Sequence, residues 1–210
     1  MQELDTSYIS NTLAKLRKAQ PSVFGSEFHR FRLNPVLSET AVSQFEAKHT
    51  IKLPGDYRRF VTNVANGGAG PFYGIFPLGE MDDNFGLKSW QEDDGFVGQL
   101  SRPFLLEEEW NDLSSMPDDA LAESNEAEYD RQMEVFDSTY WRPINGAIPI
   151  CHEGCAIRVW LIVSGSLAGQ LWEDRRSEYA GLKPLLLSGG SATTFSGWYR
   201  NWLDECVANL

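Results

Sequence analysis

The chain has little cysteine and no long apolar run. Three cysteines among 210 residues are too few, and odd in number, for a disulfide framework. The absence of any run of about 18 apolar residues excludes a hydrophobic membrane-spanning helix, so we expect no membrane partner. The first twenty residues lack the basic leader and apolar core of a secretory signal, and we therefore expect a cytoplasmic location.

Basic residues are scarce in one part of the chain. Between Glu80 and Asp137 stand 18 acidic residues against Lys88, Arg102 and Arg131, whereas the remainder has 12 acidic and 15 basic residues. Because a phosphate backbone needs a basic surface, this segment is not expected to bind nucleic acid. It is either an acidic face that attracts a basic protein and speeds association, or a solvated insertion kept soluble by its charge.

The segment 53–71, LPGDYRRFVTNVANGGAGP, contains the signals of a complete helix. Pro54 suits the first helical position, and Asp56 places a carboxylate in the first turn, where the helix dipole favours it. A capping side chain is missing at Leu53. Asn66 to Gly68 adopt left-handed conformations cheaply and so favour a helix end. The apolar positions Tyr57, Phe60, Val61 and Val64 recur at helical spacing.

Further helices are predicted before and after this segment. Residues 5–19 form a loosely periodic helix, and residues 20–34 read as a connector that docks aromatic side chains on the domain. Ser38 caps a helix that carries Val42, Phe45 and His49 on one face. A helix is expected to start at 117–119 and end near Ser138. The last segment, 193–210, repeats aromatic residues at helical spacing, which predicts a packing helix.

Strand signals gather in the last third of the chain. Four successive strands are predicted, joined by glycine-containing turns at 152–154 and 164–165. Their sequences are RPINGAIPI, CAIRVWLIV, AGQLWED and YAGLKPLLL. In the second of these, Ile157, Val159, Leu161 and Val163 give an apolar face and the alternate residues an amphipathic one. Two earlier strands are expected at 71–79 and 96–106. Short turns between neighbouring strands favour antiparallel pairing. We therefore predict an α+β fold, a largely antiparallel sheet with helices packed on one side and an acidic, partly helical insertion.

The helix segment resembles the signature of the SUKH superfamily. The resemblance lies in the Leu53-Pro54 pair, Asp56-Tyr57, Phe60 and the helix end at Asn66–Gly68. This superfamily includes bacterial toxin-immunity proteins and the fungal Smi/Knr cell-wall regulators. The order of elements is also similar: a helical pair, a strand meander that begins with Ile-Pro-Ile, a Gly-x-Leu-Trp turn-to-strand and a final aromatic helix. The resemblance covers roughly residues 37–207, and the long acidic segment departs from the minimal pattern.

The resemblance implies a division of the chain and a function. Residues 1–36 would be an N-terminal helix and connector packed on the domain, and residues 37–210 a SUKH-like domain with the acidic insertion at about 80–140. By analogy with bacterial relatives, it would be a non-enzymatic immunity protein that neutralises a cognate, basic, nuclease-like toxin by direct binding. A regulatory scaffold of the Smi/Knr type is the alternative, and a metal-dependent hydrolase a third. No cofactor is expected, and the oligomeric state stays open.

The acidic segment supplies the candidate partner-binding residues. Its two tryptophans are candidate anchors, because an aromatic side chain within a charged rim is typical of a binding hot spot. The set is Asp82, Asp83, Trp90, Glu92, Asp93, Asp94, Glu107, Glu108, Glu109 and Trp110.

Candidate chemical sites are few. In CHEGC, Cys151 to Cys155, two thiols and an imidazole resemble zinc ligands, but a structural site needs four. We therefore expect no metal here and interpret the cysteines as strand residues beside a turn. Residues 66–70 are glycine-rich but lack the Lys-Ser/Thr of a phosphate loop. The pairs Asp82-Asp83 and Asp93-Asp94 suit a metal or acid–base chemistry in principle, although solvated carboxylates are the commoner case.

Overall fold

The α+β fold with antiparallel sheets is confirmed. The computed structural model describes residues 5–83, 86–90, 95–187 and 190–210. Its helices are α1 (Thr6–Ala19), α2 (Ser26–His29), α3 (Glu39–His49), α4 (Gly55–Asn63), α5 (Asp119–Ser124), α6 (Glu126–Tyr140) and α7 (Phe195–Ala208). Its strands are β1 (Glu80–Asp83), β2 (Gly86–Ser89), β3 (Ala147–Gly154), β4 (Ile157–Ile162), β5 (Leu171–Asp174) and β6 (Leu182–Pro184), with a 3-10 turn η1 (Arg176–Glu178).

The main sheet is a meander in the order β3-β4-β5-β6, with every pair antiparallel. The turn between β3 and β4 lies at Cys155 and Ala156, one step beyond the predicted 152–154. Both residues have positive φ, 50° and 61°, which two-residue hairpin turns require. β3 runs on to Gly154 because irregularities at 149–151 and 152–154 shift its register.

Both faces of β4 are buried, the apolar one and the amphipathic one that carries Arg158 alike: all six residues of the strand are buried. The irregular segment 95–106 covers the face that carries Arg158 and its cross-strand neighbours. The Phe96 ring lies 5.3 Å from the Arg158 guanidinium, and Phe104 packs edge-on against Trp172 at 4.8 Å. A sheet covered on both sides has no solvated face, even though it is antiparallel.

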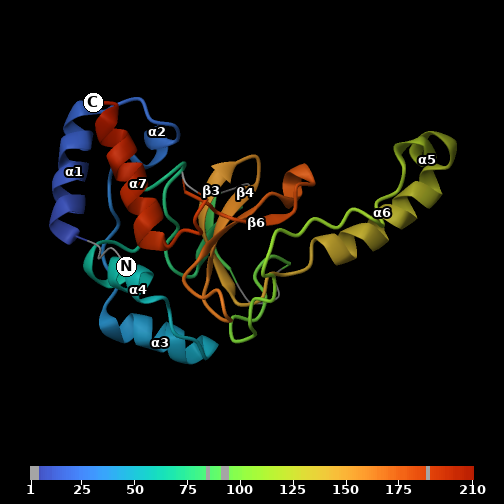
Figure 1. Cartoon of the computed structure of the whole chain (residues 1–210), viewed down its shortest axis with the longest axis horizontal. Coiled ribbons are helices and arrows are strands. Elements are labelled where there is room, and N and C mark those ends of the chain that lie inside the picture. The colour runs from blue at the N-terminus through green and yellow to red at the C-terminus, as the bar shows by residue number, and fades with distance from the viewer. Residues whose placement is uncertain (1–4, 84–85, 91–94, 188–189) are drawn as a thin grey trace.

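Helices α1, α2, α3, α4 and α7 gather on one side of the sheet (Figure 1). The closing helix α7 is joined to α4 by Asp56, whose Oδ2 accepts a hydrogen bond from the Ser196 N–H at 2.9 Å. Tyr199 donates to the Ala69 carbonyl at 2.9 Å. Trp198 and Trp202 are each 6% exposed, which confirms that this helix packs against the core.

Local signals placed most helix starts correctly. Ser38 caps α3 by accepting from the Ala41 N–H at 3.1 Å. Pro54 lies at the N-cap of α4 rather than inside it. No side chain caps α4 from the N-cap position; the Leu53 N–H, just before the helix, instead donates to Oε1 of Glu46, which is 3% exposed, at 3.0 Å. Burial opposes the ionisation of Glu46, but this hydrogen bond and Lys52 keep its pKa below the ordinary value.

Two predicted strands are absent from the described residues. Segment 71–79 makes only two isolated bridges, from Ile75 to Gly68 and to Cys151, and segment 96–106 makes only one, from Val97 to Ile144. In the first segment, positive φ at Phe72 and Gly74 folds the chain into turns. The helix expected from 117 to 138 is divided at Asn125, whose backbone is non-helical (φ −158°, ψ 78°) and whose side chain caps α6.

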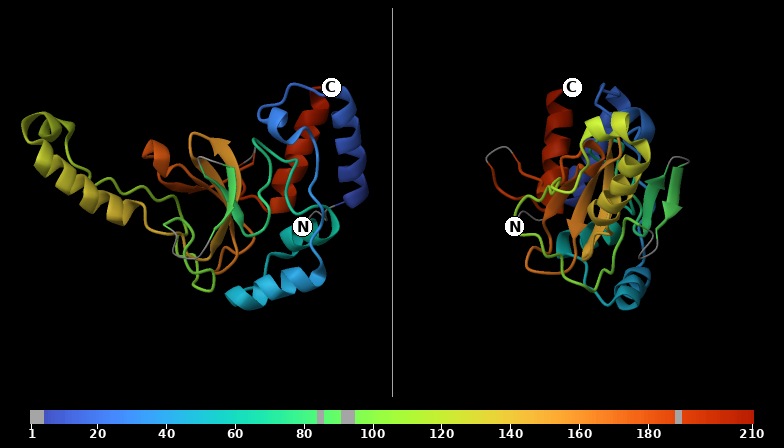
Figure 2. Two further views of the ribbon diagram at one scale, coloured as in Figure 1. Left: turned by 180° about the vertical axis from the view of Figure 1, so that it is seen from behind. Right: turned by 90° about the vertical axis from the view of Figure 1, so that its right-hand side faces the viewer.

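Helices α5 and α6 project from the end of the sheet opposite the other helices (Figures 1 and 2). α5 has no buried residue, and α6 buries Phe136 and Tyr140 near its C-terminal end. Among the described residues, no helix has the length and apolar character needed to cross a bilayer.

Candidate functional site

The acidity predicted from the sequence is concentrated on a projecting arm. Residues 107–137, which we call the acidic arm, carry twelve acidic residues against Arg131 alone. All of the twelve except Glu128 are exposed. The arm therefore presents its carboxylates to solvent, and a basic partner can reach them without unfolding any part of the core.

Two carboxylates of the arm have a pKa below the ordinary value. Hydrogen bonds from Arg131 and Gln132 lower the pKa of Glu128 to about 2. Ser114 donates to Asp112 from its backbone N–H and its hydroxyl, at 3.0 and 2.6 Å, and these hydrogen bonds lower the pKa of Asp112.

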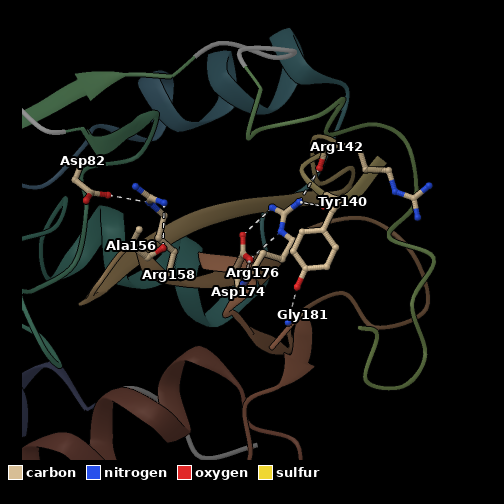
Figure 3. A network of polar contacts seen from close by, with 8 residues as sticks. All are labelled: Asp82, Tyr140, Arg142, Ala156, Arg158, Asp174, Arg176 and Gly181. Carbon is tan, nitrogen blue, oxygen red and sulfur yellow. Dashed lines mark hydrogen bonds and ion pairs between the residues drawn. The ribbon is translucent and has the colours of Figure 1, made fainter. Parts of the chain in front are cut away.

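The base of the arm is fixed to the sheet by Arg176 (Figure 3). Its Nε and Nη2 donate to the two oxygens of Asp174 at 2.9 and 2.7 Å. Its Nη1 donates to the carbonyls of Tyr140 and Arg142, at 3.1 and 2.9 Å. These carbonyls lie at the end of α6, where backbone acceptors lack helical partners and a cation is favoured. One buried guanidinium thus binds the sheet and the end of the arm helix together.

The other end of the arm is held by backbone pairing. Trp110 exchanges two hydrogen bonds with Leu182 of β6, at 2.9 and 2.8 Å. A Cβ on Gly181 would lie 2.0 Å from the Trp110 carbonyl, so only glycine permits this approach. Tyr140 joins the two ends, since its hydroxyl donates to Asn111 at 2.9 Å and accepts from the Gly181 N–H at 3.2 Å. We call residues 110, 111, 140, 174, 176 and 181 the arm root.

The predicted partner-binding residues lie in different environments in the structure. Glu107, Glu108 and Glu109 are exposed on the arm, and Trp110 is half-buried in the root, where its ring lies 5.5 Å from Tyr140. Trp90 is only 6% exposed. It packs against Phe45 and His49 at 6.0 and 5.8 Å, so it belongs to the core and its assignment as an interface anchor is corrected.

Asp82 is not a free surface anion. Its Oδ1 accepts from Arg158 Nε at 3.0 Å, and its Oδ2 lies 2.9 Å from His152 Nδ1. Burial would raise the pKa of Asp82, but the hydrogen bond from His152 and the charge of Arg158 hold it below the ordinary value. These three residues, the Asp82 clasp, tie β1 to β3 and β4. Asp83 lies in β1. Glu92, Asp93 and Asp94, which the sequence also predicts to bind a partner, lie outside the described residues.

No family model, curated protein or solved structure matches the chain.

The sequence cluster Cys151 to Cys155 does not converge on a metal site. The Cys151 thiol is buried and lies 3.3 Å from the Pro71 carbonyl, whereas Cys155 is exposed and His152 is engaged with Asp82. Burial raises the pKa of Cys151 well above its ordinary value, which makes it a poor thiolate. Within the part of the chain that the structure describes, no three His, Cys, Asp or Glu side chains are placed to hold a metal ion.

A cleft of about 810 Å³ lies beside the Asp82 clasp. Its walls include Phe28 and Tyr73, with Arg32 and Asn34 at the same opening. Sequence reasoning treated Phe28 only as part of a docking connector. No local pattern marks this cleft, because its lining comes from α2, from the chain around residues 68–76, from the β1 and β2 pair and from the end of β3.

Proposed function

We propose that the protein is a non-enzymatic binding protein whose acidic arm captures a basic protein partner. Following the SUKH resemblance, that partner is a cognate bacterial toxin, which the protein neutralises in the cytoplasm by occupying its surface. One observation carries the proposal: nearly all of the chain's net negative charge stands exposed on a projecting arm. The arm, residues 107–137, contributes −11 of the net −12.

The electrostatics of the arm suit rapid capture. A cluster of one sign of charge steers an oppositely charged partner and raises the association rate. The shape of the arm adds to this effect, since α5 and α6 project away from the sheet (Figures 1 and 2). A charge distribution that only served solubility would not need to be gathered on one element.

The arm root supports capture in a second way. Binding costs free energy when a flexible segment must be ordered. Arg176 and Tyr140 already fix both ends of the arm on the sheet, so less ordering remains to be done on binding. Exposed apolar side chains lie near the charges, with Leu105 80% and Val135 54% exposed, and they offer apolar contacts within a charged rim.

A regulatory scaffold of the Smi/Knr type is the second candidate. The same arm would then recruit signalling proteins, and the identity of the partner and the neighbouring genes distinguish the two cases. A toxin gene beside this one favours immunity. Hydrolysis by the Asp82-Asp83 pair is disfavoured, because both oxygens of Asp82 are occupied by Arg158 and His152.

The test compares charge reversals on and off the arm. The arm variant is Glu107→Lys with Glu109→Lys, and the control is Glu27→Lys with Glu205→Lys, which makes the same charge change at exposed sites elsewhere. Asp82 is left intact because reversing it would break the clasp. The partner is purified with the protein from its native host, and association rates are measured at low and high salt.

We expect the arm variant to associate several-fold more slowly than wild type at low salt, and the control to differ little. High salt should narrow the difference, since exposed charges are screened beyond about 8 to 10 Å near physiological ionic strength. Equal rates for the arm variant and wild type, or a partner that is itself acidic, would refute the proposal and leave the arm as a solubilising insertion.

A further inference from the structure

The cleft beside the Asp82 clasp has the size and walls of a small-molecule site. Its volume, about 810 Å³, lies within the roughly 300 to 1,000 Å³ usual for such sites. Phe28 and Tyr73 meet nearly at a right angle, with ring centroids 4.8 Å apart and an interplanar angle of 86°. Phe24 lies 5.4 Å from the Tyr73 ring. Together these rings form an aromatic corner.

The aromatic corner is exposed to an unusual degree. Phe28 and Leu87, which both line the cleft, are 68% and 56% exposed, and Phe24, which contacts Tyr73 but lines a neighbouring hollow, is 62% exposed. Single exposed apolar side chains are common, but a group of them around one hollow marks a binding surface.

The charge available in the cleft is positive. Asp82 is the acidic residue of the lining, and Arg158 and His152 occupy both of its oxygens. Arg32, also in the lining, is exposed, and its guanidinium makes no ion pair within the described residues. An arginine fork pairs with a carboxylate through two parallel hydrogen bonds.

The backbone of the cleft does not favour a phosphate. Phosphate sites gather several free N–H groups around the anion. Here two glycine N–H groups of the lining are already used, since Gly68 donates to the Ile75 carbonyl and Gly74 to the Pro71 carbonyl, each at 2.9 Å. A single arginine guanidinium, without several backbone N–H groups around it, suits the two oxygens of a carboxylate.

From these contacts we propose that the cleft binds a small aromatic carboxylate. The ring of the ligand packs in the corner between Phe28 and Tyr73, and its carboxylate pairs with Arg32. This site is separate from the acidic arm and does not depend on the function proposed for the arm.

The cleft is held in shape before any ligand arrives. The Tyr73 N–H donates to the His152 carbonyl at 3.4 Å, and the Tyr73 ring lies 5.4 Å from the His152 ring. His152 is in turn fixed by Asp82. The clasp thus positions Tyr73, and little free energy is lost in ordering the site on binding.

The test is calorimetric titration of the full chain with benzoate, phenylacetate and indole-3-acetate, each paired with its carboxamide, and with phenyl phosphate. We expect at least one carboxylate to bind in the micromolar to low millimolar range, and its carboxamide and phenyl phosphate to bind more weakly. Arg32→Gln should weaken carboxylate binding about tenfold or more, the loss typical of a charge-assisted hydrogen bond, and leave the carboxamide unchanged. Arg59→Gln, at an exposed arginine of α4 outside the cleft, is the matched control.

The aromatic wall is tested with a second pair of variants. Tyr73→Ala should weaken carboxylate and carboxamide alike, whereas Tyr73→Phe should bind as wild type does, because the ring and not the hydroxyl makes the wall. The proposal is overturned if none of the three carboxylates binds at 10 mM. It is equally overturned if carboxamides or phenyl phosphate bind as well as carboxylates, or if Arg32→Gln and Arg59→Gln behave alike.

Discussion

Arg176 attaches the end of the arm helix to the sheet. It is 1% exposed, and its guanidinium donates four hydrogen bonds, two to Asp174 and two to carbonyls at the end of α6. A buried ion pair adds little net stability compared with a well-packed apolar pair, but removing one partner leaves the other charge buried and unpaired. The free energy of unfolding is therefore sensitive to changes at this residue.

We expect Arg176→Met to lower the free energy of unfolding by about 3 to 5 kcal/mol, the usual cost of stranding a buried charge. Arg176→Lys should cost less, because it keeps the charge but loses the fork. Urea unfolding measures both. Combining Arg176→Met with Asp174→Leu should restore part of the loss, and a cost below about 1 kcal/mol for Arg176→Met alone would contradict the role given to the network.

Glu153 should make the free energy of unfolding depend on pH. Burial, together with the negative charge of Glu173, raises the pKa of Glu153 from 4.5 to about 7. Between these two values the folded protein binds more protons than the unfolded chain, so this group destabilises the fold progressively as pH rises from about 4.5 to about 7.

Glu153→Gln should remove that dependence. At pH 8 the variant is expected to be more stable than wild type by about 1 to 3 kcal/mol, a value reduced for the partial exposure of the group, and at pH 4 the two should be alike. Denaturant unfolding at both pH values checks this, with the exposed Glu108→Gln as control. A difference of the same size at both pH values would show that packing, and not ionisation, separates the variants.

At the scale of elements, the sequence predicted correctly those helices and strands whose own residues determine the backbone conformation. The helix of residues 55–63 and the closing helix have strong apolar periodicity, and the four strands of the meander have β-branched and aromatic runs between turns. The segments 71–79 and 96–106 have equally apolar sequences. Part of each segment is buried because other segments cover it, as Trp172 covers Phe104, and apolar character predicts such burial better than it predicts backbone conformation.

The closing helix offers a direct test of core packing. Trp202 contacts Tyr199 at 5.3 Å, His29 at 5.8 Å and Phe31 at 6.4 Å, so Trp202→Ala should cost about 3 to 5 kcal/mol. Val207→Ala on the same helix, where the side chain is 40% exposed, should cost less than about 1 kcal/mol. Thermal or urea unfolding compares them, and equal costs would mean that the tryptophan face is not the packed one.

At the scale of the whole molecule, the location of the charge could be predicted and the identity of the contacts could not. Counting residues was enough to find the acidic segment. The roles of Trp90 and Asp82 were missed because their partners are distant: Asp82 pairs with Arg158, 76 positions away. The arm root was missed for the same reason, since Arg176 acts on carbonyls 34 and 36 positions earlier.

The arrangement also predicts how stability varies across the molecule. Local opening is easiest where few apolar contacts are buried, and a helix as short as α5 is marginal without packing. In the free protein, amides of 119–131 should therefore exchange with solvent hydrogen fast, with protection below about 100-fold. Amides of β4, which is fully buried, should exchange only through global unfolding, and those near Tyr140 should be intermediate because the root holds them.

Hydrogen exchange measured by mass spectrometry, with and without the captured partner, tests this gradient and the proposed interface together. If the arm is the binding face, the partner should slow exchange in 107–137 and leave β4 unchanged, because β4 is already limited by the stability of the whole fold. Arg176→Lys should raise exchange near Tyr140 before it affects β4, since it loosens the root first. If amides of the arm exchange as slowly as those of β4 in the free protein, the arm packs on the core. If the partner slows exchange only outside residues 107–137, the interface does not lie on the arm.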